Sequence, residues 1–356
     1  MAADFDEQQR DCVENGTKKE IIAKGIDKGK ERCYDFYRLS AKLKTKGDDM
    51  QAGLKRTCRQ IGRNWGLYLL LLPSLILLIV FAYKPMYGVI IAFKNYKNAL
   101  GIMGSPWADP IFKNFQRFFN SYQCETTIRN TVLLSLYSMA AGFPIPIMLA
   151  LMINQITARR FRKGFQTILY LPHFISTVVM VGLLLIWLSP SRGLIGAIYK
   201  LFGQEAPNLM ASASAFPSLY VWSDVWQHAG WDSIVFLAAL SSVDPTLYEA
   251  ATVDGATRWQ KMVYIDLPLL LPTACILLIL RSGNLMNVGF EKVFLMQNEL
   301  NQQTSEVIAT YVYKLGMKSN QYSVSTAVNL FNNLINLVLL LLVNAITGKL
   351  GDTSLW

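Results

Sequence analysis

Charged residues are scarce in this sequence of 356 residues, of which only 16% are Asp, Glu, Lys or Arg. Hydrophobic residues make up 52% of the chain. An average soluble domain has about 25% charged residues, so the composition excludes an ordinary soluble protein. The same balance is typical of a chain that crosses a membrane several times. We therefore expect an integral membrane protein.

Motifs that bind nucleotides or support catalysis are also missing. No phosphate-binding pattern G-x-x-x-x-G-K-[ST] occurs, and Gly348-Lys349 lacks both the upstream glycine and the following Ser or Thr. The two histidines, His173 and His228, have no carboxylate at metal-binding spacing, and the five cysteines are scattered without a paired pattern. The sequence thus predicts no catalytic residue and no metal site. Any energy for work must come from a partner.

The first 64 residues are polar, and their second half has an excess of Lys and Arg. No apolar core follows the initial Met, so we do not expect a cleavable signal peptide here. We interpret the net charge of +10 as Lys and Arg in cytoplasmic segments that face anionic lipid, and not as a nucleic-acid footprint. Residues 1–64 are predicted to be a cytoplasmic tail that fixes the orientation. An arm against the membrane surface or an ATP-hydrolysing partner is the alternative.

Six apolar runs are long enough to cross a bilayer as helices. They cover approximately 65–83, 131–153, 165–188, 219–241, 265–286 and 324–346. Pro144, Pro146 and Pro172 are expected to bend the second and third runs, because proline cannot donate a helix hydrogen bond. The connection 84–128 contains an amphipathic stretch, Phe112–Phe119, which we assign either to the membrane interface or to packing against another subunit.

Basic residues indicate which loops face the cytoplasm. The loop 154–164 carries four of them in a short stretch: Arg159, Arg160, Arg162 and Lys163. Cytoplasmic loops have such an excess of Lys and Arg. With six spans and a basic tail, both termini lie in the cytoplasm, together with the loop 242–264. The connections 84–128, 189–218 and 287–323 are expected outside.

The loop 242–264 contains six residues that set its predicted structure: Glu249, Ala250, Ala251, Asp254, Gly255 and Ala256. Alanine beside Glu favours a helix, and Gly255 allows the backbone angles of a turn. The residues after the turn can form a second short helix, which enters the next span at Pro268. The pattern predicts a helix–turn–helix that offers a surface to a partner. A generic polar loop is the alternative.

Polar side chains inside the predicted spans are candidate functional residues, because a central Arg or Asp costs about 3 kcal/mol to insert into a bilayer. In the fourth span, four such residues share one helix face: Asp224, Gln227, His228 and Trp231. Aromatic rings stack on sugar rings while amides and carboxylates bind hydroxyls, so this mixture suits a sugar site. Hydrogen bonds between helices are the alternative interpretation. Asn284 and Asn287 lie three residues apart at the end of the fifth span and face one way.

Arg281, at the end of the fifth span, has three candidate partners. It could neutralise Glu291, pair with an acidic residue of the fourth span, or meet an anionic substrate. We favour an internal ion pair, because an unpaired charge inside a membrane protein is costly.

Four segments together resemble the EAA loop of ABC-importer permeases: Glu249-Ala250-Ala251, Asp254-Gly255-Ala256, Leu267-Pro268 and Pro272. Other stretches resemble carbohydrate-uptake permeases of the LplB/YteP type, which are related to the larger maltose-permease subunit: Lys84–Gly88, Tyr170–Ser176, Gly283–Lys292 and the closing Ser354-Leu355-Trp356. The resemblance extends from about residue 64 to the C-terminus and does not cover residues 1–60.

The resemblance implies an all-α integral membrane protein with six transmembrane helices, the type I ABC-importer permease fold and a cytoplasmic coupling helix. The residues that it implies for coupling to an ATPase are Glu249, Ala250, Ala251, Asp254, Gly255 and Ala256. Those that it implies for substrate binding are Asp224, Gln227, His228, Trp231, Asn284 and Asn287. It also implies a second permease subunit, two cytoplasmic ABC ATPase subunits that use ATP and Mg, and an external solute-binding protein. No cofactor is expected on the chain itself.

We accordingly divide the chain into four parts. These are a cytoplasmic tail at 1–64, a first helix with an external connection at 65–128, a transmembrane core at 129–348 with the EAA loop at 246–268, and a cytoplasmic tail at 349–356. The predicted function is that of a permease subunit of an ATP-driven, binding-protein-dependent importer of oligosaccharides in a bacterial plasma membrane. The alternatives are an ABC permease for peptides or amino acids and a membrane sensor or scaffold that transports nothing.

Overall fold

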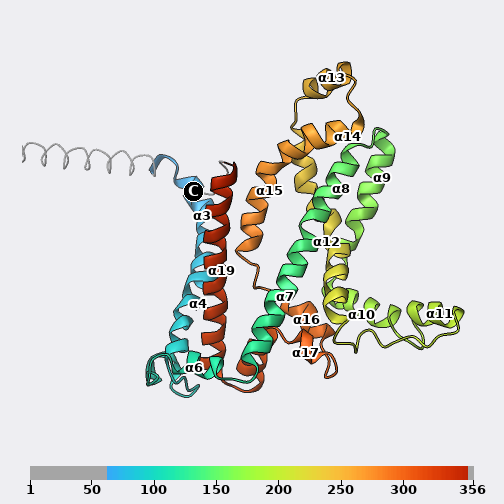
Figure 1. The fold of residues 1–356 in the computed structure, drawn as a ribbon. Helices are drawn as coiled ribbons and strands as arrows, with labels where there is room; N and C mark the ends of the chain where they lie inside the picture. Colours follow the sequence, from blue (N-terminus) through green and yellow to red (C-terminus); the bar gives the residue numbers. More distant parts are fainter. Residues whose placement is uncertain (1–61, 352–356) are drawn as a thin grey trace, which may run out of the picture. The chain divides into compact units, whose positions relative to one another are not determined.

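The computed structural model describes residues 62–351 (Figure 1). The chain divides into two compact units, Met1–Met86 and Tyr87–Trp356. The predicted N-terminal tail lies almost entirely outside the described residues, as does most of the predicted C-terminal tail. Within residues 62–351 the secondary structure is helical, apart from one isolated β-bridge between Lys94 and Trp107. The all-α class is confirmed for this part of the chain.

The described part of the first unit is one apolar helix in three pieces. It consists of α3 (Trp65–Leu78), the π-helical turn η1 (Ile79–Tyr83) and α4 (Lys84–Met86). No charged residue occurs between Trp65 and Tyr83, so every side of the helix is apolar, as in a helix surrounded by lipid or by other membrane helices. The aromatic residues at its two ends suit the membrane interfaces.

The second unit begins with three short helices, η2 (Tyr87–Phe93), α5 (Gly101–Gly104) and α6 (Lys113–Phe119). The Asn114 side chain of α6 is buried and donates to the Ala92 carbonyl at 2.9 Å. Phe118 is 1% exposed, and its ring lies 5.8 Å from that of Tyr311. The amphipathic stretch therefore packs within its own chain through Phe118, whereas Phe112 at its start is exposed.

The second candidate span combines α7 (Cys124–Gly142) and α8 (Pro144–Asn154). Pro144 begins α8, and Pro146 has no N–H to bond to the Gly142 carbonyl four residues earlier. The helix assignment is interrupted at Phe143, but Cys124–Asn154 still counts as one span and is not one of the sharply bent pairs. Pro146 nevertheless leaves the Gly142 carbonyl without its usual partner in its own helix.

The third candidate span is sharply bent. It consists of α9 (Arg159–Tyr170) with η3 (Leu171–Phe174), followed by α10 (Thr177–Trp187) at an angle of 96°. The break follows Pro172 by a few residues, and Ser176 starts α10 by accepting a hydrogen bond from the Val179 N–H at 3.3 Å. A short helix, α11 (Leu194–Leu201), lies in the next connection.

The central helix of the second unit is α12 (Phe216–Ser241), against which α7, α8, α9 and α15 pack. At Gly230 an added Cβ would lie 2.1 Å from the Leu169 carbonyl oxygen, so the absence of a side chain there allows α9 to approach. The chain turns by 73° from α12 into α13 (Pro245–Val253). It continues through α14 (Arg258–Lys261) and the π-helical turn η4 (Met262–Asp266) into α15 (Leu267–Ser282).

The last part of the chain has three short helices and one long one. They are α16 (Phe290–Met296), α17 (Gln302–Ser305), α18 (Ile308–Tyr313) and, after the π-helical turn η5 (Lys314–Lys318), α19 (Tyr322–Gly351). Glu306 is 4% exposed and pairs with Lys314, which fixes this connection. Within the second unit, α13 and α14 lie at one end and α16 and α17 at the other (Figure 1).

Four helical segments of the described chain are long and apolar enough to cross a membrane, and the number is six if each of two bent pairs counts as one span. The four are Trp65–Phe93, Cys124–Asn154, Arg258–Ser282 and Tyr322–Lys349. The bent pairs are Arg159–Phe174 with Thr177–Trp187 and Phe216–Ser241 with Pro245–Val253. Each of the six apolar runs found in the sequence overlaps one of these segments.

Candidate functional site

The helix α13 has a well-defined start directly after α12. Pro245 occupies the first helical position, and the Asp244 side chain accepts a hydrogen bond from the Thr246 N–H at 2.9 Å. Both features favour the beginning of a helix. The same hydrogen bond lowers the pKa of Asp244, because it stabilises the carboxylate.

The end of α13 is a glycine turn. Gly255 has a φ of +77°, a left-handed angle that glycine adopts without steric cost. Its N–H bonds to the Thr252 carbonyl at 3.1 Å, and the Ala256 N–H bonds to the Ala251 carbonyl at 2.9 Å. These two bonds form a Schellman motif, the common way to close a helix at a glycine. The turn predicted at Asp254-Gly255 is confirmed.

The second helix of the predicted pair, α14, has Thr257 as its N-cap, and the Thr257 hydroxyl accepts from the Gln260 N–H at 3.3 Å. Gln260 in turn accepts from the Thr257 N–H at 2.8 Å, which completes a capping box. The Lys261 ammonium donates to the Thr252 hydroxyl at 2.7 Å and so connects the two helices. We call this helix pair, Pro245–Lys261, the α13–α14 loop.

Most of the predicted coupling residues lie on the surface of the α13–α14 loop. Glu249, Ala250, Asp254 and Gly255 are exposed, whereas Ala251 and Ala256 are half-buried where their backbones close the turn. Large apolar side chains accompany them, because Leu247 is 46%, Val253 88% and Trp259 69% exposed. The loop thus offers a mixed apolar and polar surface.

A buried carboxylate anchors this loop to the rest of the second unit. Asp266, at the end of η4, is 0% exposed. It accepts hydrogen bonds from the Tyr248 hydroxyl of α13 and from Gln155 Nε2 at 2.9 Å. Asn154 Nδ2 lies 3.4 Å from the same carboxylate. We call these four residues the Asp266 hub; the sequence analysis had not selected Asp266.

A polar cavity of about 560 Å³ lies between α7, α12 and the end of α15. Four of the six predicted substrate residues line it: Asp224, His228, Asn284 and Asn287. Four cavity residues on α12 recur at every fourth position and therefore form one line along the helix: Tyr220, Asp224, His228 and Asp232. The structure thus brings four of the six predicted substrate residues to one cavity.

Two of the predicted substrate residues, Gln227 and Trp231, do not line this cavity. Gln227 is 3% exposed and donates to the Ile175 carbonyl at 2.7 Å. The Trp231 ring stacks on His173, with ring centroids 4.4 Å apart. The four residues that the spacing assigned to one face of α12 are therefore divided. Asp224 and His228 point toward the cavity, whereas Gln227 and Trp231 point toward η3 and the start of α10.

Two ion pairs flank the cavity. Lys292 of α16 lies 3.2 Å from the Asp224 carboxylate, and His228 Nδ1 lies 3.4 Å from the same group. The Lys292 side chain is 5% exposed, whereas that of Asp224 is 40% exposed. The second pair joins Arg281 of α15 to Asp232 of α12. The internal partner that we favoured for Arg281 is confirmed.

Arg281 also reaches a third span. Its Nη1 donates to the Gly142 carbonyl at 3.0 Å. That carbonyl is the one left without a helix partner by Pro146. The guanidinium has several donors in a fixed plane, so it can satisfy Asp232 and Gly142 together. One side chain therefore connects the second, fourth and fifth spans beside the cavity.

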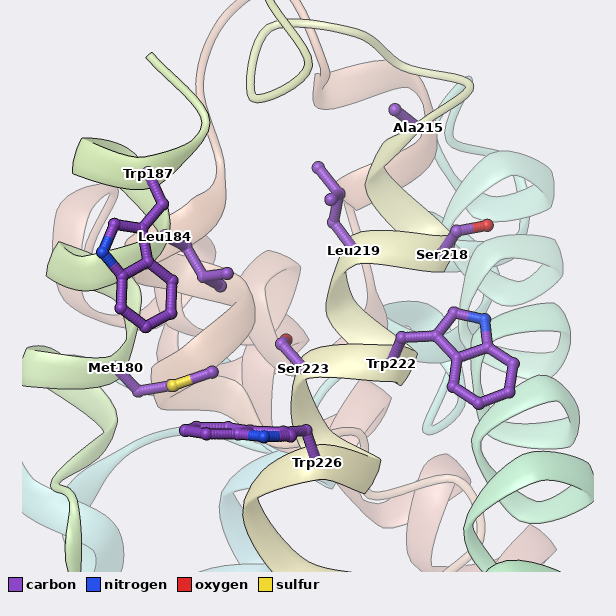
Figure 2. Close-up of a pocket in the computed structure, with 9 residues that line it drawn as sticks. All are labelled: Met180, Leu184, Trp187, Ala215, Ser218, Leu219, Trp222, Ser223 and Trp226. Atoms are coloured by element: carbon purple, nitrogen blue, oxygen red, sulfur yellow. The ribbon is translucent and has the colours of Figure 1, made fainter. Parts of the chain in front are cut away.

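A second cavity, of about 460 Å³, is lined mostly by apolar residues of α10 and α12. Met180, Leu184 and Trp187 form one side, and Trp226 reaches across from α12 toward Met180 (Figure 2). Trp222 turns away and donates to the Tyr137 hydroxyl at 2.8 Å. Three tryptophans here gave no signal in the sequence analysis, because apolar residues in a span are ordinary.

Within residues 62–351, no group of three or more His, Cys, Asp or Glu is arranged to hold a metal ion. The polar cavity instead carries amide, imidazole, carboxylate and guanidinium groups, which suit hydrogen bonding to a polar solute.

A family model described as "Binding-protein-dependent transport system inner membrane component" matches residues 142–351. The chain belongs to this family. The matched segment includes α12, the α13–α14 loop and α15, and it contains most of the cavity residues. The chain is therefore a membrane component of a transport system.

Two curated relatives come from Bacillus subtilis (strain 168). The polygalacturonan/rhamnogalacturonan transport system permease protein YteP is 40% identical over 290 residues, which is 82% of this chain and 90% of YteP. The protein LplB is 37% identical over 311 residues, which is 87% of this chain and 95% of LplB. Both matches confirm the resemblance found in the sequence.

A solved bacterial ABC transporter, involved in the import of the acidic polysaccharide alginate, contains a chain of the same fold. It is 41% identical with a TM-score of 0.77, and the match covers 83% of this chain and 99% of that chain. The type I ABC-importer permease fold predicted from the sequence is therefore confirmed.

Proposed function

We propose that this chain is the membrane-spanning permease subunit of an ATP-driven, binding-protein-dependent importer of oligosaccharides. The observation that carries the proposal is the continuity between an exposed helix–turn–helix and a polar cavity. α12 lines the cavity and leads into α13, while α15 follows α14 and ends at the cavity. A displacement of the α13–α14 loop can therefore reach the cavity along two helices.

The α13–α14 loop is the proposed docking element for a cytoplasmic ATPase. The residues assigned to coupling are Glu249, Ala250, Ala251, Asp254, Gly255 and Ala256. The exposed side chains of Leu247, Val253 and Trp259 add apolar area of the kind that protein interfaces bury at their centre. ATP and Mg belong to the partner, since the sequence has no phosphate-binding loop.

The proposed cargo is an oligosaccharide that contains uronic acids. YteP is named for polygalacturonan and rhamnogalacturonan, and the solved transporter imports alginate; galacturonan and alginate are both polymers of uronic acids. These relatives favour a sugar over a peptide or an amino acid. Asp224, His228, Asn284 and Asn287 are the proposed contacts, because their polar groups line one cavity. Gln227 and Trp231 are proposed to act indirectly, by holding η3 against α12.

The complete importer is proposed to contain a second permease subunit, two ABC ATPase subunits and an external solute-binding protein, surrounded by membrane lipid. The family name refers to binding-protein-dependent transport, and the alginate transporter was solved in complex with a pentasaccharide-bound periplasmic protein. For a bacterial plasma membrane, the proposed orientation has both termini in the cytoplasm, and the basic loop 154–164 together with six spans supports it.

Uptake by the assembled complex tests this proposal. The four kinds of subunit are reconstituted in liposomes loaded with ATP, and uptake of labelled trigalacturonate is compared with that of maltotriose and of a tripeptide. We expect ATP-dependent uptake of trigalacturonate and none of the tripeptide. Uptake of the tripeptide alone would overturn the proposed cargo, and uptake of maltotriose alone would remove the uronate requirement.

Gly255→Pro tests the coupling role in the same complex. Proline cannot adopt the φ of Gly255 and deletes the N–H that bonds to Thr252, so the end of α13 must rearrange. We expect intact assembly with loss of stimulated ATP hydrolysis and uptake. Gly203→Pro is the matched control, because Gly203 also has a positive φ but lies outside the α13–α14 loop. If Gly255→Pro hydrolysed ATP and imported sugar like the wild type, the loop would not be the coupling element.

A further inference from the structure

Asp266 stands out among the buried polar groups because it joins three separate parts of the chain. It belongs to η4 and leads directly into α15. Its carboxylate accepts from Tyr248 of α13 and from Gln155, which follows α8. These partners lie 18 and 111 positions away in the sequence. The three parts are held at one point by a group with no access to water.

The Asp266 carboxyl group is satisfied by hydrogen bonds from three side chains. The ion pairs of residues 62–351 involve Asp224, Asp232 and Glu306 as acids, but not Asp266. Burying a carboxylate without a cation is unfavourable unless donors satisfy its oxygens. A Tyr hydroxyl and two amide groups donate to these oxygens here. The geometry of the hub is therefore tightly specified.

A second polar contact joins the second and fifth spans at another position along their helices. Arg281 of α15 donates to the carbonyl of Gly142, which ends α7 just before α8 begins. At 1.5 Å per helical residue, the contact at Asp266 and the contact at Arg281 are about 20 Å apart along each helix. Two contacts at this separation prevent α8 and α15 from sliding past each other. The Asp266 hub adds α13 to this fixed pair, and Arg281 adds α12 through Asp232.

We propose that Asp266 is the positioning residue that makes α13 move as one body with α8 and α15. The path of the displacement is short: from α13 through the Tyr248 hydroxyl to Asp266, and along α15 to Arg281 and Asn284 at the cavity. Without the hub, α13 is joined to the cavity through the turn from α12, the turn at Gly255 and the hydrogen bond between Lys261 and Thr252. This inference rests on the proposed coupling role of the α13–α14 loop.

The experiment compares three variants in the complete importer. Asp266→Asn turns one hydrogen-bond acceptor into a donor that faces the Gln155 amide, and Tyr248→Phe removes only the hydroxyl. The double variant Asp266→Asn/Gln155→Glu restores a complementary pair, since the new Asn can donate to the new Glu while its oxygen still accepts from Tyr248. Tyr264→Phe is the matched control, because Tyr264 lies in the same turn η4 but is 76% exposed.

Two quantities are measured for each variant. Amide hydrogen exchange of residues 246–253 reports how firmly α13 is held, and the amount of ATP hydrolysed per trigalacturonate imported reports coupling. We expect Asp266→Asn and Tyr248→Phe to assemble, to exchange faster in α13, and to hydrolyse severalfold more ATP per sugar. The double variant should recover on both measures, and Tyr264→Phe should match the wild type.

The proposal is overturned if Asp266→Asn and Tyr248→Phe assemble and keep the wild-type ratio of ATP to sugar. A purely structural role would lower the yield of complex without changing that ratio. A double variant no better than Asp266→Asn would also contradict the hub. If Asp266→Asn fails to fold, Tyr248→Phe tests the proposal, because it removes one hydroxyl and leaves the carboxyl group and both amides in place.

Failure of the proposed function is separable from failure of this inference. If the wild-type complex imports no trigalacturonate, the proposed cargo is wrong, but exchange in α13 still shows whether the hub fixes that helix. In that case, the ATP hydrolysis stimulated by the binding protein is measured instead of the amount of ATP hydrolysed per sugar imported. Wild-type exchange and stimulation in both single variants would then refute the role of Asp266.

Discussion

Replacement of Arg281 is expected to loosen three spans at once. The guanidinium bonds to Asp232 of α12 and to the Gly142 carbonyl, which Pro146 leaves without a helix partner. In Arg281→Met the aliphatic part of the side chain is kept while all donors are lost. Both the carbonyl and the Asp232 carboxylate then need other partners beside the cavity.

The expected size of the effect follows from these two contacts. Loss of the hydrogen bond to the Gly142 carbonyl costs about 1 kcal/mol. An exposed ion pair contributes less than about 1 kcal/mol, whereas removal of one partner of a buried pair costs about 3–5 kcal/mol. The Arg281 and Asp232 side chains are 40% and 31% exposed, so the pair lies between these limits. Taking about 2 kcal/mol for the pair, we expect Arg281→Met to lose about 3 kcal/mol in total.

A double-mutant cycle in lipid–detergent bicelles measures this quantity. Asp232→Asn should lose about 2 kcal/mol, because Arg281 keeps its bond to Gly142. The double variant Asp232→Asn/Arg281→Met should be no less stable than Arg281→Met alone, which gives a coupling free energy of about 2 kcal/mol. The stability of Arg281→Lys should lie between that of the wild type and that of Arg281→Met, because an ammonium does not reproduce the planar set of donors of a guanidinium. Additive losses in the double variant, within about 0.5 kcal/mol, would refute the direct pair.

Three further predictions concern stability. Gly230→Ala should cost about 1–3 kcal/mol of stability in thermal unfolding, because its Cβ would lie 2.1 Å from a backbone oxygen of α9. The control Gly182→Ala in α10 meets no atom within 4 Å and should be neutral or stabilising. Asp224→Asn should cost about 3 kcal/mol of stability in the bicelle assay, because it leaves the buried Lys292 ammonium without its ion pair. Lys292→Met should cost less, because the remaining Asp224 carboxylate reaches the cavity. Asp244→Ala should speed amide exchange in the first turn of α13, whereas Asp244→Asn, also a good cap, should not.

Much of this fold could be predicted because its signals are local. The apolar runs, the prolines at 144 and 146 and the glycine at 255 each act within a few residues of themselves. Length alone identifies a span, a proline removes one hydrogen bond, and a glycine permits one angle. The α13–α14 loop was predictable for the same reason, since its cap, its Schellman motif and its capping box are made by residues at most five positions apart.

The division of the α12 face could not be predicted from spacing. One broad face of α12 carries all four candidate residues, but two different surroundings adjoin it. The residues spaced by four, which include Tyr220 and Asp232, line the cavity. Gln227 and Trp231 instead contact η3 and the residue after it. Only the positions of α15 and η3 decide where the boundary lies. A repeat of polar residues at every fourth position was the available signal, and it would have added Asp232 to the candidate site.

Asp266 was missed for a related reason, and it shows which long-range contacts can be expected in such proteins. An acid just before Leu267-Pro268 looks like the hydrated end of a span, and none of its partners is recognisable by local pattern. The Arg281 contact, by contrast, follows from a rule that can be applied in advance. A proline inside a span removes the N–H for the carbonyl four residues earlier, and water is absent to replace it. A donor from another span must therefore supply it, and Arg281 is the cation that the fifth span offers near Gly142.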